Sequence, residues 1–276
     1  MRLYFKKSHK PGLLLLLIAS SLLPACAPMT KPDSRPISPE QENNYVLKSA
    51  RIKTLGHAKG QLAQLEIATN DPLATTFEFM VVKVNHYQAK FYKQNSQEHA
   101  AYVSTIGKEE AAFLAVNGGF FTPSFTPDGL FYKHGKTITA PSKQPIFNAM
   151  VVINKQGRLT LGNSDTPYKD AAYAIQAGPL LIDQNQMLVS RVNQFNQFAK
   201  RTVLAESSSG QLLVISTSAM SLYTLENILY EHPEWFGVSK ITTAVNLDGG
   251  RSSAIYVANH TAINGKNKVE NVLLFS

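Results

Sequence analysis

The sequence has little cysteine, little charge and no apolar run of membrane-spanning length, and each shortage excludes a class of protein. A single cysteine among 276 residues excludes an intrachain disulfide framework and a cysteine-rich zinc site. Charged residues make up 17% of the chain, below the usual quarter, which argues against a disordered acidic or basic protein. The seven histidines show no H-x-x-x-H spacing, and no internal repeat is visible. The length suffices for one domain and is short for two with full cores.

The N-terminal residues are typical of a bacterial secretion signal. An apolar run of about a dozen residues, Gly12 to Leu23, is too short for a bilayer, which needs about 20. It ends at Leu23-Pro24-Ala25-Cys26, which resembles a lipobox although Pro24 is less typical of that pattern. We therefore expect residues 1–25 to be a signal peptide and Cys26 to anchor a lipoprotein in the cell envelope. Cleaved secretion is the alternative. The run is preceded by a basic n-region made of Arg2, Lys6, Lys7 and Lys10.

Removing that signal halves the net charge. The full chain carries +8, and loss of four basic residues leaves +4. This balance does not call for nucleic acid as a partner and is compatible with an anionic substrate. Residues 26–45 carry four prolines among polar residues, which predicts an extended tether. Residues 46–276 then form one folded domain, whose oligomeric state the sequence does not indicate.

Short β-branched and aromatic runs dominate the domain and predict strands. A helix is expected after Ser221, which is a good N-cap for an apolar face at helical spacing and is followed by Pro233. A shorter helix is expected over Lys108–Phe113. Many strands with few helices indicate an α+β fold. The predicted strands are Phe77–Val84, Ala149–Asn154, Leu212–Ser216, Ile241–Asn246 and Val272–Phe275.

Four segments combine turn residues with polar side chains beside predicted strands. Paired glycines permit positive φ and close approach of a ligand, and turn N–H groups bind anions. The planar fork of an arginine fits phosphate. Each segment also has a plain structural interpretation, since Gly-Gly is often just a tight turn. Ser252-Ser253 lacks the G-x-S-x-G context of a serine hydrolase. The segments are AVNGGFF (115–121), AIQAGPLL (174–181), KRTV (200–203) and NLDGGRSSA (246–254).

Taken in order, AVNGGFF, PDGL, AIQAGPLLI, RT and NLDGGRSSAIYV resemble the phosphodiester glycosidase family, that of N-acetylglucosamine-1-phosphodiester α-N-acetylglucosaminidase. The likeness runs from about Leu73 to the C-terminus. One departure is Arg251, where the family commonly has another glycine before the serines. The resemblance implies a single strand-rich domain of twisted mixed sheets whose loops converge on one pocket. It also implies hydrolysis of a sugar-1-phosphate diester at the anomeric bond, on an envelope or extracellular glycan.

The residues themselves are consistent with that chemistry. A phosphate monoester is a good leaving group, so one carboxylate suffices where ordinary glycosidases need two. We expect Asp248 to act as base or nucleophile and Arg201 to hold the phosphate. Asp128 and Glu206 are reserve carboxylates. The expected substrate-binding residues are Asn117, Gly118, Gly119, Gly178, Thr202, Asn246, Gly249, Gly250, Arg251, Ser252 and Ser253.

Two other functions stay open at this point. The same site could break the P–O bond as a phosphodiesterase, or the domain could bind an anionic envelope polymer without catalysis. Metal use is also open. Asp248 with neighbouring carbonyls could hold Ca²⁺ or Mg²⁺, although no ligand set of the usual spacing is visible.

Overall fold

The computed structural model describes residues 45–55, 59–69, 75–189 and 197–276. The expected signal peptide, Cys26 and nearly all of the expected tether lie outside the described residues. Within these ranges no helix is long and apolar enough to cross a membrane.

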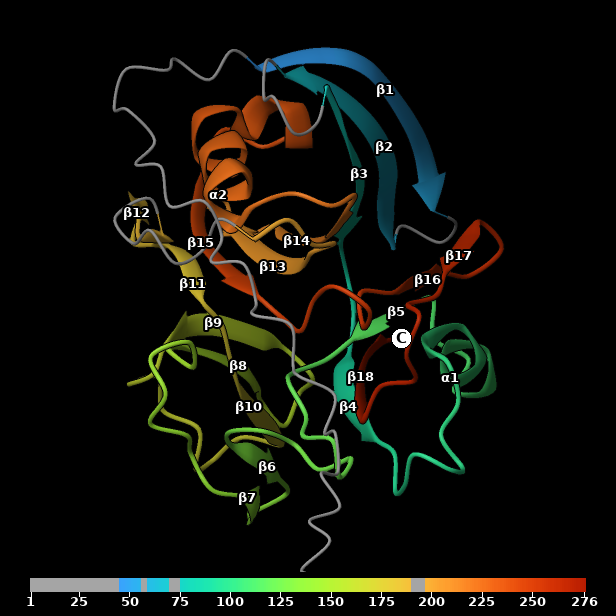
Figure 1. Ribbon diagram of the computed structural model, residues 1–276, viewed down its shortest axis with the longest axis vertical. Helices are drawn as coiled ribbons and strands as arrows, with labels where there is room; N and C mark the ends of the chain where they lie inside the picture. Colours follow the sequence, from blue (N-terminus) through green and yellow to red (C-terminus); the bar gives the residue numbers. More distant parts are fainter. Residues whose placement is uncertain (1–44, 56–58, 70–74, 190–196) are drawn as a thin grey trace, which may run out of the picture. The chain divides into compact units, whose positions relative to one another are not determined.

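The largest element is an eight-stranded sheet (Figure 1). Successive side chains of a strand point to opposite faces of the sheet. Both faces are covered, because Val81 packs into one hydrophobic cluster and Val82 into another. Its strands, in spatial order, are β1 (Tyr45–Leu55), β2 (Gly60–Thr69), β3 (Thr76–Val84), β14 (Leu212–Thr217), β13 (Thr202–Ser207), β15 (Ile241–Asn246), β11 (Leu180–Asp183) and β12 (Gln186–Met187).

Two five-stranded sheets pack against one face of this sheet through a shared core that contains Val82, Val151 and Leu273. The first, in spatial order, consists of β7 (Lys136–Thr139), β6 (Phe131–Lys133), β10 (Tyr173–Ala177), β8 (Ala149–Ile153) and β9 (Leu159–Asn163). The second consists of β17 (Thr261–Ile263), β16 (Ile255–Val257), β5 (Leu114–Asn117), β18 (Asn271–Phe275) and β4 (Ala89–Lys93).

The strand-rich α+β fold expected from the sequence is confirmed, and each predicted strand is present within a residue. The pairing differs from the expected mixed sheets, because every ladder between described strands is antiparallel. Short turns such as 154–158 and 208–211 join several consecutive strands, and a hairpin makes its two strands antiparallel.

The two predicted helices had different outcomes. Helix α2 (Leu222–Glu231) starts where expected, with the Ser221 hydroxyl accepting a hydrogen bond from Thr224 N at 2.9 Å, and packs on the outer face of the large sheet. A 3₁₀ turn, η3 (Pro233–Phe236), follows it.

The prediction of a helix over Lys108–Phe113 is wrong. Helix α1 spans Val103–Glu109, and the chain then turns at Ala111, whose φ is +49°. Phe113 N bonds to Phe275 O, which draws the next residues into β5.

Candidate active site

The four segments singled out in the sequence meet where several strands end. Asn117 ends β5, Thr202 begins β13 and Asn246 ends β15. Leu247 N donates to Thr202 O at 2.8 Å, and Asp248 N donates to Gly118 O at 3.2 Å. Gly178 N donates to Asn246 O at 2.9 Å, which brings in the fourth segment. Antiparallel register therefore gathers residues that are far apart in the chain, such as Asn117 and Asp248, which lie 131 positions apart.

Asn117 holds these segments together. Its side chain is fully buried, and its amide donates to Asp248 O at 2.7 Å and to Gly118 O at 3.4 Å. Its carbonyl accepts from Thr202 Oγ1 at 2.7 Å and from Ala254 N at 3.1 Å. Thr202 Oγ1 is also 3.2 Å from Ser253 Oγ. The polar atoms of Asn117 are thus engaged inside the protein, so this side chain fixes the loops in position.

Asn246 joins the segment that contains Asp248 to the Gly178 turn. Its amide donates to Gly178 O at 2.9 Å and to Leu247 O at 2.7 Å. Gly178 has φ +148°, and a Cβ there would lie 1.9 Å from Ile146 O, so only glycine fits. Asn246 Oδ1 is buried without a hydrogen-bond partner among the described residues. A buried carbonyl of this kind is usually satisfied by an ordered water.

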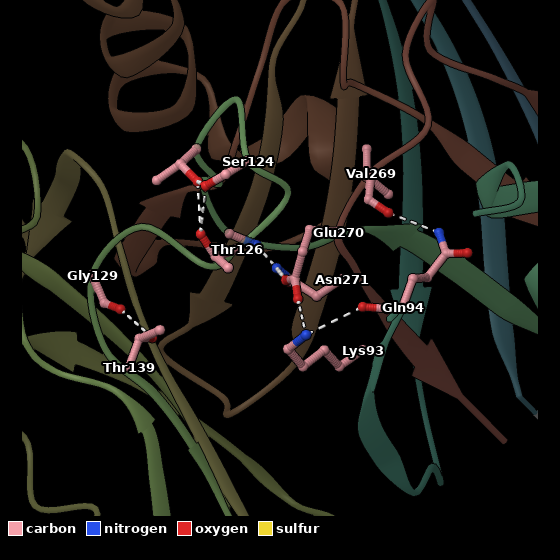
Figure 2. A network of polar contacts seen from close by, with 11 residues as sticks. Lys93, Gln94, Ser124, Thr126, Gly129, Thr139, Val269, Glu270 and Asn271 are labelled. Carbon is pink, nitrogen blue, oxygen red and sulfur yellow. Dashed lines mark hydrogen bonds and ion pairs between the residues drawn. The ribbon is translucent and has the colours of Figure 1, made fainter. Parts of the chain in front are cut away.

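The Gly118-Gly119 turn rests on a polar network that sequence reasoning missed. Asn271 O and Oδ1 accept from Gly118 N and Gly119 N, both at 2.9 Å. Asn271 Nδ2 donates to the fully buried Glu270 at 2.8 Å, and Lys93 Nζ lies 2.7 Å from the other oxygen of that carboxylate. Figure 2 shows Lys93, Glu270 and Asn271 side by side. No spacing could have revealed them, because Lys93 reaches Glu270 only through the pairing of β4 with β18.

Asp248 is a carboxylate whose surroundings disfavour its charge. Burial raises the pKa of Asp248 to about 6, and hydrogen bonds from Ser252 and from Gly249 N only partly offset that effect. Gly249 N donates to Asp248 Oδ1 at 2.8 Å. A pKa of about 6 lies near neutral pH, where a carboxyl group can both hold and release a proton.

Arg201 is a buried cation without a described acidic partner. It is 9% exposed, and burial lowers the pKa of Arg201 to about 10, so the guanidinium is charged at neutral pH. Its Nε donates to Met220 O at 3.1 Å and its Nη2 donates to Gln197 O, both neutral carbonyls. A Cβ on Gly249 would lie 3.9 Å from Arg201 Nη1. The guanidinium therefore lies beside the turn that carries Asp248.

The glycine N–H groups of both turns are used inside the protein. Gly118 and Gly119 donate to Asn271, Gly249 donates to Asp248, and Gly250 N donates to Lys200 O at 2.8 Å. We expected these N–H groups to help hold a phosphate, and in this structure each of them has an acceptor within the protein. Both turns are closed by their own hydrogen bonds, whereas the Arg201 guanidinium bonds to the neutral carbonyls of Met220 and Gln197 and has no described counter-charge.

The other residues expected at the site differ in how exposed their side chains are. Ser252 and Ser253 are buried, whereas the Arg251 side chain is exposed and its Nε donates to Asn267 Oδ1 at 3.1 Å. Of the reserve carboxylates, Asp128 lies in the loop after Gly119, and its N donates to Phe120 O at 2.9 Å. Glu206 lies near the far end of β13 from Thr202, and burial raises its pKa. The described residues contain no cluster of three or more His, Cys, Asp or Glu able to hold a metal.

Comparison with known proteins places this chain in a family. The phosphodiester glycosidase family (NAGPA) matches residues 110–276, more than half of the chain. No curated protein matches the sequence. A hypothetical protein from Synechocystis has a similar structure, with TM-score 0.60 and 16% identity over 83% of this chain; the match spans 64% of that protein.

The zebrafish N-acetylglucosamine-1-phosphodiester α-N-acetylglucosaminidase catalytic domain, auto-inhibited by its pro-peptide, also has a similar structure. Its TM-score is 0.52, with 16% identity over 84% of this chain and 82% of that one. At this identity the two structural likenesses concern the fold, whereas the family assignment rests on the sequence match. That match covers β5, β13, β15 and the loops that carry Asp248 and Arg201. The chain belongs to the phosphodiester glycosidase family and carries its hydrolase domain.

Proposed function

We propose that the domain hydrolyses a sugar-1-phosphate diester at its anomeric bond, with a phosphorylated envelope or extracellular glycan as substrate. One observation carries the proposal: a buried guanidinium with no described acidic partner lies beside the turn that holds a carboxylate of raised pKa. A buried charge is normally paired, because desolvation is costly. The bound phosphate would supply the missing counter-charge of Arg201.

In this mechanism the C1–O bond between sugar and phosphate breaks. The bonding electron pair leaves with the phosphate oxygen, and Arg201 stabilises the charge that grows there. Two routes are open to Asp248. As a base it would take a proton from the water that attacks C1, and as a nucleophile it would itself attack C1 before water releases the sugar. The stereochemistry separates them, since attack by water inverts C1 whereas two successive attacks retain its configuration.

A hydrolysis screen in ¹⁸O-labelled water tests the proposal. The purified domain would be offered a panel of sugar-1-phosphodiesters that includes N-acetylglucosamine-1-phosphodiesters, with the Asp248→Asn protein alongside. We expect the label in the released sugar. Label in the phosphate would make the protein a phosphodiesterase. Binding of the whole panel without turnover would leave a domain that binds an anionic envelope polymer.

We also propose that the mature protein is a lipoprotein anchored through Cys26. The support is the lipobox-like Leu23-Pro24-Ala25-Cys26 after a basic and then apolar N-terminal segment. Metabolic labelling with a radioactive fatty acid in a bacterial host should mark the protein, and Cys26→Ser should abolish the label. A labelled Cys26→Ser protein, or an unlabelled parent, would contradict the anchor.

A further inference from the structure

Arg251 occupies the exposed tip of the turn that follows Asp248. Ser252 N donates to Gly249 O at 3.1 Å, which closes the turn around Arg251. The two ends of this turn contact the candidate catalytic groups. Ser252 bonds to the Asp248 carboxylate, and Gly249 lies beside the Arg201 guanidinium. Because the Arg251 side chain is exposed, it places a positive charge on the solvent side of the same turn.

The loop between β17 and β18 holds Arg251 in position. Arg251 Nε donates to Asn267 Oδ1 at 3.1 Å, and Arg251 O accepts from Asn267 N at 3.0 Å. A Cβ on Gly265 would lie 2.4 Å from Arg251 O, so only glycine allows the loop to approach this closely. Among the described residues, no hydrogen bond or ion pair uses the two terminal nitrogens of the Arg251 guanidinium. The protein therefore orients this side chain while leaving the outer edge of its planar fork free for an anion.

Two lysines extend the positive charge around Arg251. Lys266 and Lys268 lie on either side of the residue that bonds to Arg251, and the chain has no acidic residue between Asp248 and Glu270. Glu270 does not compensate them, because it is fully buried in its own ion pair. None of the three cations forms an ion pair with a described residue. We call Arg251, Lys266 and Lys268 the basic rim.

The charges of the basic rim suit a ligand with several negative charges. Like charges on neighbouring segments repel one another, yet Arg251 packs against the loop that carries both lysines. An anionic ligand would relieve this repulsion and be attracted by all three cations. A single exposed ion pair contributes little, so a ligand gains substantially only when its own charge is multiple.

We propose that the basic rim binds a second phosphate of the substrate, beyond the phosphate held by Arg201. The preferred substrate is then a chain with phosphates at successive residues rather than a lone diester. The proposal rests on the function proposed above and specifies its substrate. Buried Arg201 meets the phosphate at the bond that breaks, and exposed Arg251 meets the next phosphate where the chain leaves the site. Since Arg251 stands where the family commonly has glycine, this preference is a property of this chain.

Four esters of N-acetylglucosamine 1-phosphate test the preference. Two carry only the scissile phosphate, with methanol or 1,3-propanediol as the alcohol. The other two add a second phosphate, either at O6 of the sugar in the methyl ester or at the free end of the propanediol ester. We expect kcat/KM of at least one two-phosphate ester to exceed that of its one-phosphate match by about 10-fold at low salt. The ester that gains shows on which side of the scissile bond the second phosphate binds.

Salt should weaken the preference, because exposed charges are screened. Raising NaCl from about 0.05 M to about 0.5 M should lower the ratio of kcat/KM between the matched esters from about 10 to about 2. A ratio that does not depend on salt would contradict binding by the exposed cations of the rim.

Removal of the rim charges should have the same effect as salt. In Arg251→Gln, and in Lys266→Gln combined with Lys268→Gln, the ratio should fall to about 2 or below. The ratio is taken within each protein, so a general loss of activity cancels. Arg158→Gln is the matched control, because it removes one charge from an exposed arginine between β8 and β9, and it should keep the ratio of the parent protein. Equal kcat/KM for one- and two-phosphate esters, or a preference that survives both rim variants, would overturn the proposal.

Calorimetry separates failure of this proposal from failure of the proposed function. Tripolyphosphate should bind the parent protein about 10-fold more tightly than phosphate at low salt, and Arg251→Gln should remove most of the difference whereas Arg158→Gln should not. If no diester turns over but this pattern holds, the hydrolase function fails and the basic rim stands. If the diesters turn over without preference for a second phosphate, the rim assignment fails and the hydrolase function stands.

Discussion

Two sets of wholly or partly buried charges lie close together in this domain and differ in how they are compensated. Lys93 and Glu270 form an ion pair of 2.7 Å, and Asn271 occupies the remaining carboxylate oxygen. Arg201 and Asp248 are also withdrawn from water, yet no described residue forms an ion pair with either. Burial moves the pKa of Arg201 to about 10 and that of Asp248 to about 6, each in the direction that favours the neutral form.

We propose that the difference separates a structural use of buried charge, at Lys93 and Glu270, from a catalytic use, at Arg201 and Asp248. A paired charge contributes to positioning and is strongly destabilising only when one partner is removed. Charges without a partner in the free protein are typical of sites that act on a ligand, and perturbed pKa values gather at such sites. Asn271 links the two sets, since it binds Glu270 on one side and the Gly118-Gly119 turn on the other.

Substitution Asp248→Asn should have the largest effect on activity. The amide keeps the shape of the side chain but cannot act as base or nucleophile, so kcat should fall on the order of 10³-fold or more. Circular dichroism and the thermal midpoint should show an intact fold. A near-normal kcat would show that Asp248 takes no part in the mechanism. Asp248 would then be a structural carboxylate, as Glu270 is.

Replacement of Arg201 should have the next largest effect. Arg201→Ala should lower kcat/KM for sugar-1-phosphodiesters about 10²-fold, because a desolvated charge at a phosphate contributes a few kcal/mol. Arg201→Lys should recover part of the loss, since lysine keeps the charge without the planar fork. Arg158→Ala removes a guanidinium that lies 5.1 Å from the Tyr87 ring centroid and serves as control. Equal kinetics for Arg201→Ala and Arg158→Ala would make Arg201 an ordinary charge.

Substitutions in the Lys93–Glu270 ion pair should change the stability of the domain rather than its kcat. Lys93→Met leaves the buried Glu270 carboxylate without its described counter-charge and should lower the free energy of unfolding by about 3 kcal/mol. Adding Glu270→Gln to it should restore part of the loss, because no charge is then stranded. Urea unfolding measures both, and kcat should stay within about 10-fold. Unchanged stability in Lys93→Met would show that the pair does not anchor the turn.

The smallest effect concerns pH. The folded-state pKa of Asp248, about 6, lies above its ordinary value of 3.8, so the native state binds the proton more tightly than the unfolded state. Stability from this group is full below about pH 4 and is lost as pH rises through 6. Asp248→Asn should thus be more stable than the parent at pH 8, by about 1–2 kcal/mol, and the difference should vanish at pH 4. Urea unfolding at both pH values measures this difference. If the stability difference between Asp248→Asn and the parent is the same at pH 8 and pH 4, burial does not raise the pKa of Asp248.

Sequence reasoning succeeded where the information is local. The cap at Ser221, the strand at Ile241–Asn246 and the turns after Asn117 and Asn246 follow from neighbouring residues, and the structure contains them. It failed at Lys108–Phe113, where pairing with β18 outweighed helix propensity. It also missed Glu270 and Asn271, whose importance comes from contacts with β4 and the Gly118-Gly119 turn.

The sequence by itself determined the strand-rich class of the domain, the loops that carry Asp248 and Arg201, and the family to which they belong. Only the tertiary structure decided which groups are free to meet a substrate. The fold bonds the glycine N–H groups and Asn117 inside the protein and leaves the Arg201 guanidinium without a described acidic partner. The physical reason is that hydrogen-bond partners and desolvation depend on contacts between residues far apart in the chain, which no local pattern encodes.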